Sequence, residues 1–236
     1  MKTKNKINLV CIIPARGGSK SVKSKNTKIL LGKPLIHYTL KTAKQSKIFD
    51  KIIVSSDCLH TKKIVNQYSG IEFYYRPKNI SGDKAKTESA LLHVCQTLEK
   101  KENFIPDYIY TLEPTSPFRK ISTILKSKKI IEETDADSII AIGETSKNFG
   151  KIKNNKFRFD SPNLNRRRQD RSNLYFESGT IYVTKYEILK KLKTVIGKSL
   201  YPIIVSEIET IDINNIYDFY LCESIMKNLK RMERLK

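Results

Sequence analysis

The chain of 236 residues has 39% apolar residues, enough for one sizeable core, which excludes a disordered protein. No apolar run approaches the roughly 18 residues of a membrane span, and the lysine-rich first residues lack a signal-peptide core. Four scattered cysteines without a C-x-x-C pair indicate reduced thiols, so we expect a cytoplasmic protein without membrane insertion. The net charge of +21 comes from basic residues spread along the chain, which leaves nucleic-acid binding only a remote alternative.

Segments with strand and helix patterns alternate along the sequence. In chain order they predict a strand at 7–13, a helix at 35–46, strands at 51–55 and 71–75, a helix at 87–98, a strand at 107–112, a helix at 121–133, strands at 138–142 and 180–183, a helix at 185–193, a strand at 201–205 and a last helix after Asn215. Strands separated by helices indicate an α/β fold with a doubly wound, mostly parallel sheet.

The alternation breaks at residues 144–175, which are polar and contain short aromatic pieces. We expect this segment to protrude as an insertion from a main domain formed by residues 1–143 and 176–236. It is too short to bury a core of its own, yet it carries aromatic side chains such as Phe157 and Phe159. A twofold-related copy would cover them, which predicts a homodimer.

The first expected strand leads into a loop at 14–26 that contains two adjacent glycines, Arg16 and three lysines. Glycines let backbone N–H groups approach an anion closely, and the cations neutralise it. A polyphosphate site at the carboxyl end of a parallel strand needs both features. The loop matches neither a Walker A motif nor G-x-G-x-x-G, and the alternative is a solvated surface loop.

Two more polar segments follow expected strands. Asp57 comes directly after the strand at 51–55, and we expect it to cap the next helix. The sequence Glu-Pro-Thr-Ser-Pro-Phe-Arg at 113–119 follows the strand at 107–112. Both lie after the carboxyl ends of strands, where α/β folds place functional residues.

Several motifs occur in order over nearly the whole chain. They are Ile-Pro-Ala-Arg-Gly-Gly-Ser-Lys at 13–20 with Lys25 and Asn26, Gly-Lys-Pro-Leu-Ile at 32–36, Ile-Val-Ser-Ser-Asp at 53–57, Arg-Pro at 76–77 with Ser-Gly-Asp at 81–83, the 113–119 segment, Arg-Gln at 168–169, Glu-Ser-Gly-Thr-Ile-Tyr at 177–182 and Ile-Asp-Ile at 211–213. In this set the chain resembles the CMP-sialic acid synthetase family of cytidylyltransferases, which activate acidic eight- or nine-carbon sugars with CTP. The resemblance implies a Rossmann-like nucleotidyltransferase fold whose insertion mediates dimerisation.

The resemblance also implies roles residue by residue. The CTP phosphates would be held by Arg16, Ser19, Lys20 and Lys25. The cytosine and ribose would lie among Asn26, Arg76, Ser81 and Asp83. The acidic nine-carbon sugar would meet Glu113, Thr115, Ser116, Arg168, Gln169 and Ser178. Mg²⁺, with Mn²⁺ as the alternative, would be held by Asp212 and Asn214.

The implied reaction is attack of the anomeric hydroxyl of a 2-keto sugar acid on the α-phosphorus of CTP, with pyrophosphate leaving. Such a reaction needs alignment and charge neutralisation, for which Arg16, Lys25 and Asp212 are the candidate catalytic residues. The sequence identifies no general base. The alternative for Asp212 is to cap the last helix.

Three positions depart from the family pattern. Glu113 stands where many relatives have Gln, Asn214 where many have Asp, and Phe-Glu-Ser-Gly at 176–179 where some have Arg-Pro-Asn-Gly. A carboxylate beside an anionic sugar favours an acceptor that offers an N–H or hydroxyl group. Legionaminic or pseudaminic acid types are therefore as well supported as N-acetylneuraminic acid. The alternative functions are cytidylyl transfer to 3-deoxy-octulosonate and another sugar nucleotidyltransferase.

Overall fold

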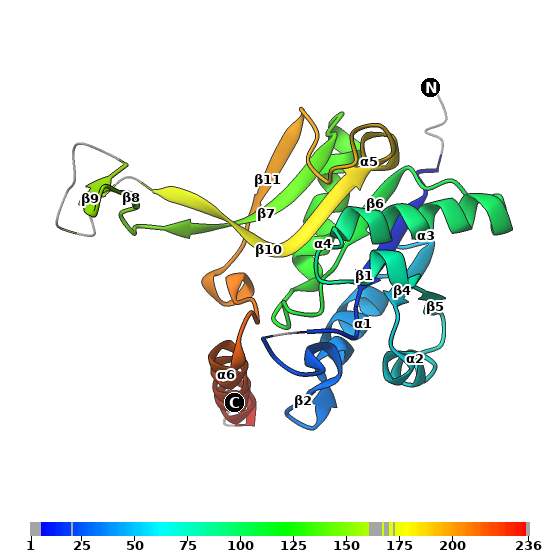
Figure 1. Ribbon diagram of the computed structural model, residues 1–236, viewed down its shortest axis with the longest axis horizontal. Helices are drawn as coiled ribbons and strands as arrows, with labels where there is room; N and C mark the ends of the chain where they lie inside the picture. The colour runs from blue at the N-terminus through cyan, green and yellow to red at the C-terminus, as the bar shows by residue number, and fades with distance from the viewer. Residues whose placement is uncertain (1–5, 20, 161–166, 168–169, 172, 235–236) are drawn as a thin grey trace.

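A seven-stranded sheet forms the centre of the computed structural model, which describes residues 6–19, 21–160, 167, 170–171 and 173–234 (Figure 1). In spatial order its strands are β11 (Leu200–Ile204), β7 (Ser138–Thr145), β10 (Leu174–Lys185), β6 (Tyr108–Thr111), β1 (Leu9–Pro14), β4 (Lys51–Ser56) and β5 (Glu72–Tyr75). Neighbouring strands pair in parallel except β10, which is antiparallel to both β6 and β7. The predicted α/β fold with a mostly parallel sheet is confirmed.

Helices cover both faces of this sheet. One face carries α1 (Leu35–Ser46), α2 (Leu59–Val65) and α4 (Ile121–Glu133), and the other carries α3 (Thr87–Glu102) and α5 (Tyr186–Leu192). Successive side chains of β1 explain this arrangement, because Cys11 packs with the first group of helices while Val10 and Ile12 pack with the second. A strand buried on both faces requires the continuous apolar run that the sequence shows.

The last helix, α6 (Ile216–Arg234), stands apart from the two helix layers. Its buried residues Phe219, Cys222 and Met226 pack on Leu30 and Leu35, below the sheet in Figure 1. Leu30 belongs to a small ribbon of β2 (Ile29–Leu30) and β3 (Lys33–Pro34). Short 3₁₀ turns occur at η1 (Lys25–Thr27), η2 (Lys78–Ile80) and η4 (Glu207–Thr210). No described helix is long and apolar enough to cross a membrane.

An arm projects from one side of the molecule (Figure 1). It consists of the far ends of β7 and β10 together with the hairpin of β8 (Gly150–Lys153) and β9 (Lys156–Phe159). The pairing of Thr145 with Leu174 carries the main sheet into the expected insertion at 144–175. The hairpin side chains are exposed, including Phe157 and Phe159, whose rings meet edge to face at 4.8 Å.

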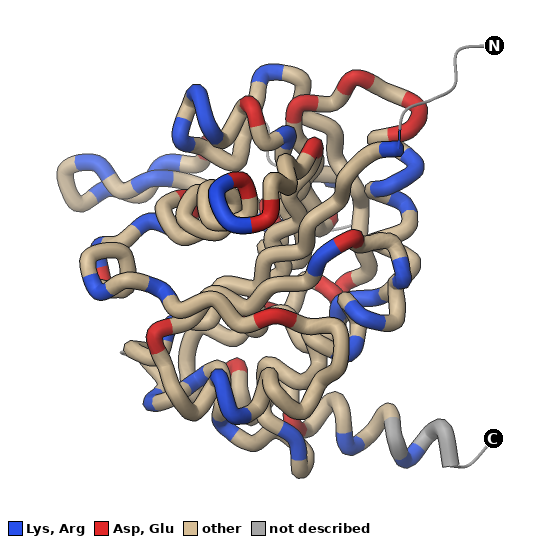
Figure 2. Tube along the Cα trace, turned by 90° about the vertical axis from the view of Figure 1, so that its right-hand side faces the viewer, with Lys and Arg blue, Asp and Glu red and all other residues tan. Residues whose placement is uncertain are grey.

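The carboxyl ends of β1, β4 and β6 gather their loops at one edge of the sheet. β1 lies between β4 and β6. After β1 the chain forms β4 and β5 on one side of it and then crosses over to form β6 on the other side. Open α/β sheets bind ligands at such a switch point. Basic residues, in contrast, are spread over the whole chain trace rather than gathered there (Figure 2).

Candidate functional site

The loop at 15–27, which follows β1, is anchored through its backbone. The Gly17 N–H donates to Asp57 Oδ1 at 2.7 Å, and Asn26 Nδ2 donates to the Arg16 carbonyl at 3.0 Å. A Cβ at Gly17 would lie 2.9 Å from the Cβ of Cys58, so the close approach requires glycine. The prediction that Asp57 caps α2 is wrong: Cys58 occupies the N-cap position, and Asp57 holds the loop instead.

Two segments predicted to surround the nucleotide are joined by an ion pair. Arg16 Nη1 lies 2.9 Å from Asp83 Oδ1, and both side chains are partly exposed. Ser19 lies on the same loop and is also partly exposed. The predicted phosphate ligand Lys20 lies outside the described residues.

Arg76 is fixed against the end of β4. Its Nε donates to Ser55 Oγ at 3.2 Å and its Nη2 to the Ser55 carbonyl at 3.0 Å. Burial lowers the pKa of Arg76, and the nearby Asp57 carboxylate opposes this shift. Ser81 Oγ donates to the Pro77 carbonyl at 2.8 Å, which stabilises the turn that follows Arg76.

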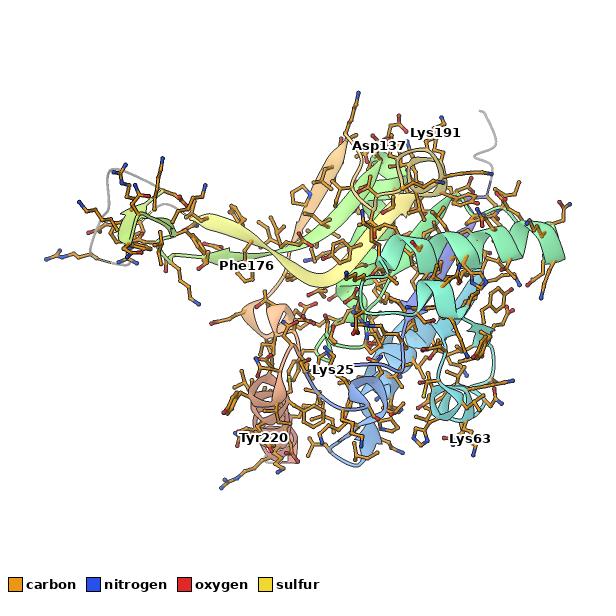
Figure 3. All side chains as sticks on the ribbon, in the orientation of Figure 1. Lys25, Lys63, Asp137, Phe176, Lys191 and Tyr220 are labelled. Atoms are coloured by element: carbon orange, nitrogen blue, oxygen red, sulfur yellow. The ribbon has the colours of Figure 1, made fainter. Side chains whose placement is uncertain are left out.

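Lys25 connects this loop to the segment before α6. Its Nζ donates to the Ile213 carbonyl at 2.8 Å, and its side chain lies between the sheet and α6 (Figure 3). Burial lowers the Lys25 pKa, while Asp212 and then Glu113 oppose the shift. One ammonium group and two carboxylates predicted to act on different substrates therefore share one electrostatic environment.

The Asp212 carboxylate is not used to start α6. Asn215 Oδ1 accepts from the backbone N–H groups of Tyr217 and Asp218, which caps the helix. Asp218 Oδ2 accepts in return from the N–H groups of Asn214 and Asn215. Within the described chain, no hydrogen bond or ion pair reaches the Asp212 side chain.

Glu113 begins the loop at 113–119, and its carboxylate, like that of Asp212, is not used in a hydrogen bond within the described chain. Burial raises the pKa of its carboxyl, the Asp212 charge raises it further, and Arg119 and Lys25 oppose the shift. Among the described residues, none donates a hydrogen bond to this carboxylate. A carboxyl group withdrawn from water without a partner costs free energy, so its position suits contact with a ligand.

Arg119, at the end of the same loop, holds the surrounding backbone together. Its guanidinium donates to the Thr180 carbonyl, to Thr39 Oγ1 at 3.0 Å and to the Glu113 carbonyl at 2.8 Å. Burial lowers the pKa of Arg119 to about 10, which leaves it charged at neutral pH. Arg119 was not among the predicted site residues, although its place at the end of the 113–119 motif was a signal for it.

The remaining predicted sugar residues are mostly buried. Thr115 and Ser116 lie on the 113–119 loop, and Ser116 Oγ approaches the Gly179 carbonyl at 3.4 Å. Thr115 accepts the Ile213 N–H at 2.9 Å through its carbonyl, while its buried hydroxyl has no partner among the described residues. Ser178 Oγ donates to the Ala141 carbonyl at 3.1 Å. Arg168 and Gln169 lie outside the described residues.

The donor set around Asp212 fits Mg²⁺ in a phosphate complex. No group of three or more His, Cys, Asp or Glu side chains with metal-site geometry occurs in the described parts of the chain. Mg²⁺ at phosphoryl-transfer sites usually takes one or two carboxylates, water and substrate phosphates, so Asp212 beside the basic loop is sufficient. Asn214 is exposed two residues further on.

Residues 10–221 match the cytidylyltransferase family model. The chain belongs to this family. It is 32% identical to the pseudaminic acid cytidylyltransferase of Campylobacter jejuni over 73% of this chain and 76% of that protein. It is 27% identical to the CMP-N,N'-diacetyllegionaminic acid synthase of Legionella pneumophila over 94% of this chain and 97% of that protein.

The chain also matches longer members of the family. It is 27% identical to the N-acylneuraminate cytidylyltransferase of Escherichia coli over 99% of its own length but only 54% of that protein, and thus spans about half of it. Among solved structures, a CMP:2-keto-3-deoxy-manno-octonic acid synthetase complexed with CTP has a TM-score of 0.69 at 13% identity, over 94% of this chain and 99% of that one. At this identity the likeness shows the Rossmann-like nucleotidyltransferase fold alone.

Proposed function

We propose that this family member transfers the cytidylyl group of CTP to a nonulosonic acid, producing a CMP-sugar and pyrophosphate. The observation that carries the proposal is the convergence of Lys25, Asp212 and Glu113 at the carboxyl edge of the sheet. The Lys25–Ile213 hydrogen bond ties the basic loop to the segment that bears Asp212. This arrangement supports a site in which phosphate-binding cations and acceptor-side carboxylates act together.

At the nucleotide end, Arg16 and Lys25 would neutralise the triphosphate. Arg16 is held by one exchangeable ion pair with Asp83, and a phosphate oxygen can replace that carboxylate. Gly17 allows the loop backbone to approach the phosphates closely. Asn26, within this loop, and Arg76, on the neighbouring segment after β5, would position the ribose and base.

At the acceptor end, Glu113 and the backbone around Thr115 would orient the sugar so that its anomeric oxygen lies in line with the α-phosphorus. Asp212, with Asn214, would hold Mg²⁺. When bound, the metal supplies Lewis-acid stabilisation of the negative charge that develops on phosphate oxygens. Alignment of the two substrates accounts for much of the expected rate enhancement.

We also propose that the segment 144–175 mediates a homodimer. The arm exposes Phe149, Ile152, Phe157, Phe159 and Tyr175, an apolar set that a protein surface rarely leaves in water. A twofold-related copy would bury them. Deleting residues 151–163 is expected to give monomers that still bind CTP, as measured by sedimentation velocity and calorimetry. A fully active wild-type monomer at micromolar concentration would contradict this assignment.

The second candidate acceptor is 3-deoxy-octulosonate, favoured only by the fold likeness to the octonic acid synthetase. A panel with CTP and Mg²⁺ separates the candidates, using N-acetylneuraminic, legionaminic and pseudaminic acids and 3-deoxy-octulosonate. We expect kcat/KM for at least one nonulosonic acid to exceed that for octulosonate by about a hundredfold. A difference of this size corresponds to the loss of one or two polar contacts with the acceptor. The reverse order would transfer the proposal to the octulosonate.

A further inference from the structure

A bulge in β10 brings two polar side chains together beside the site. Glu177 pairs with Ile142 and Tyr182 with Ile140, so the six residues 177–182 of β10 lie opposite the three residues 140–142 of β7. Ile140 and Ile142 are on one face of β7, which puts Glu177 and Tyr182 on one face as well. The Tyr182 hydroxyl donates a hydrogen bond to Glu177 Oε1. Bulges of this kind re-aim side chains next to functional sites.

The bulge is built into the same frame as the 113–119 loop. Arg119 donates to the Thr180 carbonyl, and the Thr180 hydroxyl donates at 2.7 Å to the Glu209 carbonyl. Gly179, at φ +70°, makes the turn that only a residue without a side chain enters freely. The positions of Glu177 and Tyr182 are therefore coupled to the loop that carries Glu113.

Tyr182 lies on the part of β10 that runs beside the end of β6, and β6 leads into the 113–119 loop. Burial and the Glu177 contact raise the pKa of the Tyr182 phenol, and the charges of Glu113 and Asp212 add to the shift. Tyr182 also pairs with Thr111 at the end of β6, two residues before Glu113. The phenol is thus neutral and close to the acceptor end.

We propose that Glu177 is a positioning and specificity-determining residue for the acceptor sugar. A phenol has a single proton, and Glu177 takes it, so the Tyr182 oxygen can only accept a hydrogen bond from a ligand. The acceptor must supply a donor at that point. The inference deepens the proposed function and selects nonulosonic acids that bear an N–H substituent over those whose matching substituent lacks a donor.

The test uses pairs of acceptors that differ in one atom. At each carbon bearing nitrogen, the acetamido compound is compared with its acetoxy isostere, which keeps the shape but loses the N–H. For the wild-type protein we expect kcat/KM to fall by roughly 5- to 100-fold at one position, the cost of leaving a partly buried acceptor unpaired. The loss should lie in KM for the sugar, with kcat and KM for CTP unchanged within about twofold.

Variants then assign the effect to the pair. In Glu177→Met the freed phenol proton can serve the ester oxygen, so the acetamido-to-acetoxy ratio should fall below about three. Glu177→Gln keeps an acceptor for that proton and should preserve most of the ratio. Tyr182→Phe should abolish the preference by itself, which keeps the test decisive even where Glu177→Met folds poorly. Glu187→Met, on the exposed surface of α5, is the matched control and should change nothing.

A double variant separates positioning from general stability. In the Tyr182→Phe background, Glu177→Met should cause no further change in the ratio, because Glu177 acts only through the phenol. If Glu177→Met changed the acetamido-to-acetoxy ratio as much in the Tyr182→Phe background as in the wild-type protein, the proposal would be overturned. Equal use of both isosteres at every position by the wild-type protein would also overturn it. Absence of any CMP-sugar with all acceptors would instead refute the proposed function itself.

Discussion

Two glutamates lie close to the β10 bulge, Glu209 buried and Glu113 partly buried, and their surroundings differ. Glu209, in η4, accepts hydrogen bonds from Thr123 Oγ1 at 2.6 Å, from the Lys120 N–H at 3.1 Å and from Ser206 Oγ at 3.0 Å. Glu113 has no such donors among the described residues. Burial by itself favours a higher pKa for both carboxyl groups. At Glu209 the hydrogen-bond donors outweigh burial and the pKa is lowered, whereas at Glu113 the pKa is raised.

The difference separates a carboxylate that supports the fold from one that is available to a ligand. Partnered buried charges connect segments, as Glu209 connects η4 to the start of α4. An unpartnered one destabilises the folded protein and is tolerated where binding needs it. Asp212 and Glu113 belong to the second class by this criterion.

The largest loss of activity should come from replacing the two cations of the basic loop, Arg16 and Lys25. Arg16→Ala and Lys25→Ala are each expected to lower kcat/KM by roughly two to three orders of magnitude, the scale of one lost preorganised charge contact. Arg16 lies on a partly exposed loop, so its replacement should leave the unfolding free energy nearly unchanged. Steady-state kinetics and denaturant unfolding of the same samples check both statements. Near wild-type turnover in either variant would remove the basic loop from the site.

Replacing the partnered glutamate should harm the fold and spare the chemistry. Glu209→Ala leaves three donors unpaired and is expected to cost about 3 kcal/mol of unfolding free energy. Its kcat at a temperature where the variant is folded should stay within about threefold of wild type. Glu133→Ala, which removes an exposed i,i+4 pair with Lys129, is the control and should cost less than about 0.5 kcal/mol. Equal losses in both variants would contradict the structural role of Glu209.

The metal requirement tests the second free carboxylate. We expect chelator to abolish activity and Mg²⁺ or Mn²⁺ to restore it. Asp212→Asn should raise the half-saturating metal concentration by about tenfold or more, and Asn214→Asp should lower it, because charge on the ligands governs affinity for hard cations. Titrations of activity against metal at fixed CTP give these values. An enzyme indifferent to chelator would exclude the metal role of Asp212.

The smallest effects are opposite pH dependences of stability. The folded-state pKa of Glu113 is raised, so its contribution is present below the unfolded pKa and is lost as pH rises through the folded value. That of Glu209 is lowered, so its contribution is present above the unfolded pKa and is lost as pH falls. Glu113→Gln should therefore gain stability over wild type on going from about pH 4 to pH 8, and Glu209→Gln should lose it. Denaturant unfolding at both pH values checks the signs.

Much of the fold could be predicted from the sequence because its signals are local. The apolar run of β1, the amphipathic pattern of α3 and the polar end of β6 each follow from residues close in the chain. The length of β10 could not be predicted in this way. The expected strand began at Thr180, whereas the pairing with β7 starts at Leu174. Strand pairing across a bulge depends on partners distant in sequence.

The site was predictable in its members but not in its connections. Motif positions identified Glu113 and Asp212, whereas the role of Arg119 depends on contacts with Thr39 and Thr180, far away in the chain. The same holds for Asp57, which a local rule assigned to a helix cap and the fold assigned to the Gly17 backbone. Side chains that act between loops become visible only when the loops are placed together.

Identification of the products formed from CTP, Mg²⁺ and a nonulosonic acid such as N,N'-diacetyllegionaminic acid decides whether this protein is a nonulosonic acid cytidylyltransferase. We expect a CMP-sugar, detected by mass spectrometry with the α-phosphate retained, and pyrophosphate in a one-to-one ratio with it. Both should be lost together in Lys25→Ala. Pyrophosphate release without a CMP-sugar from any nonulosonic acid, or a CMP-octulosonate as the only sugar nucleotide, would contradict this expectation.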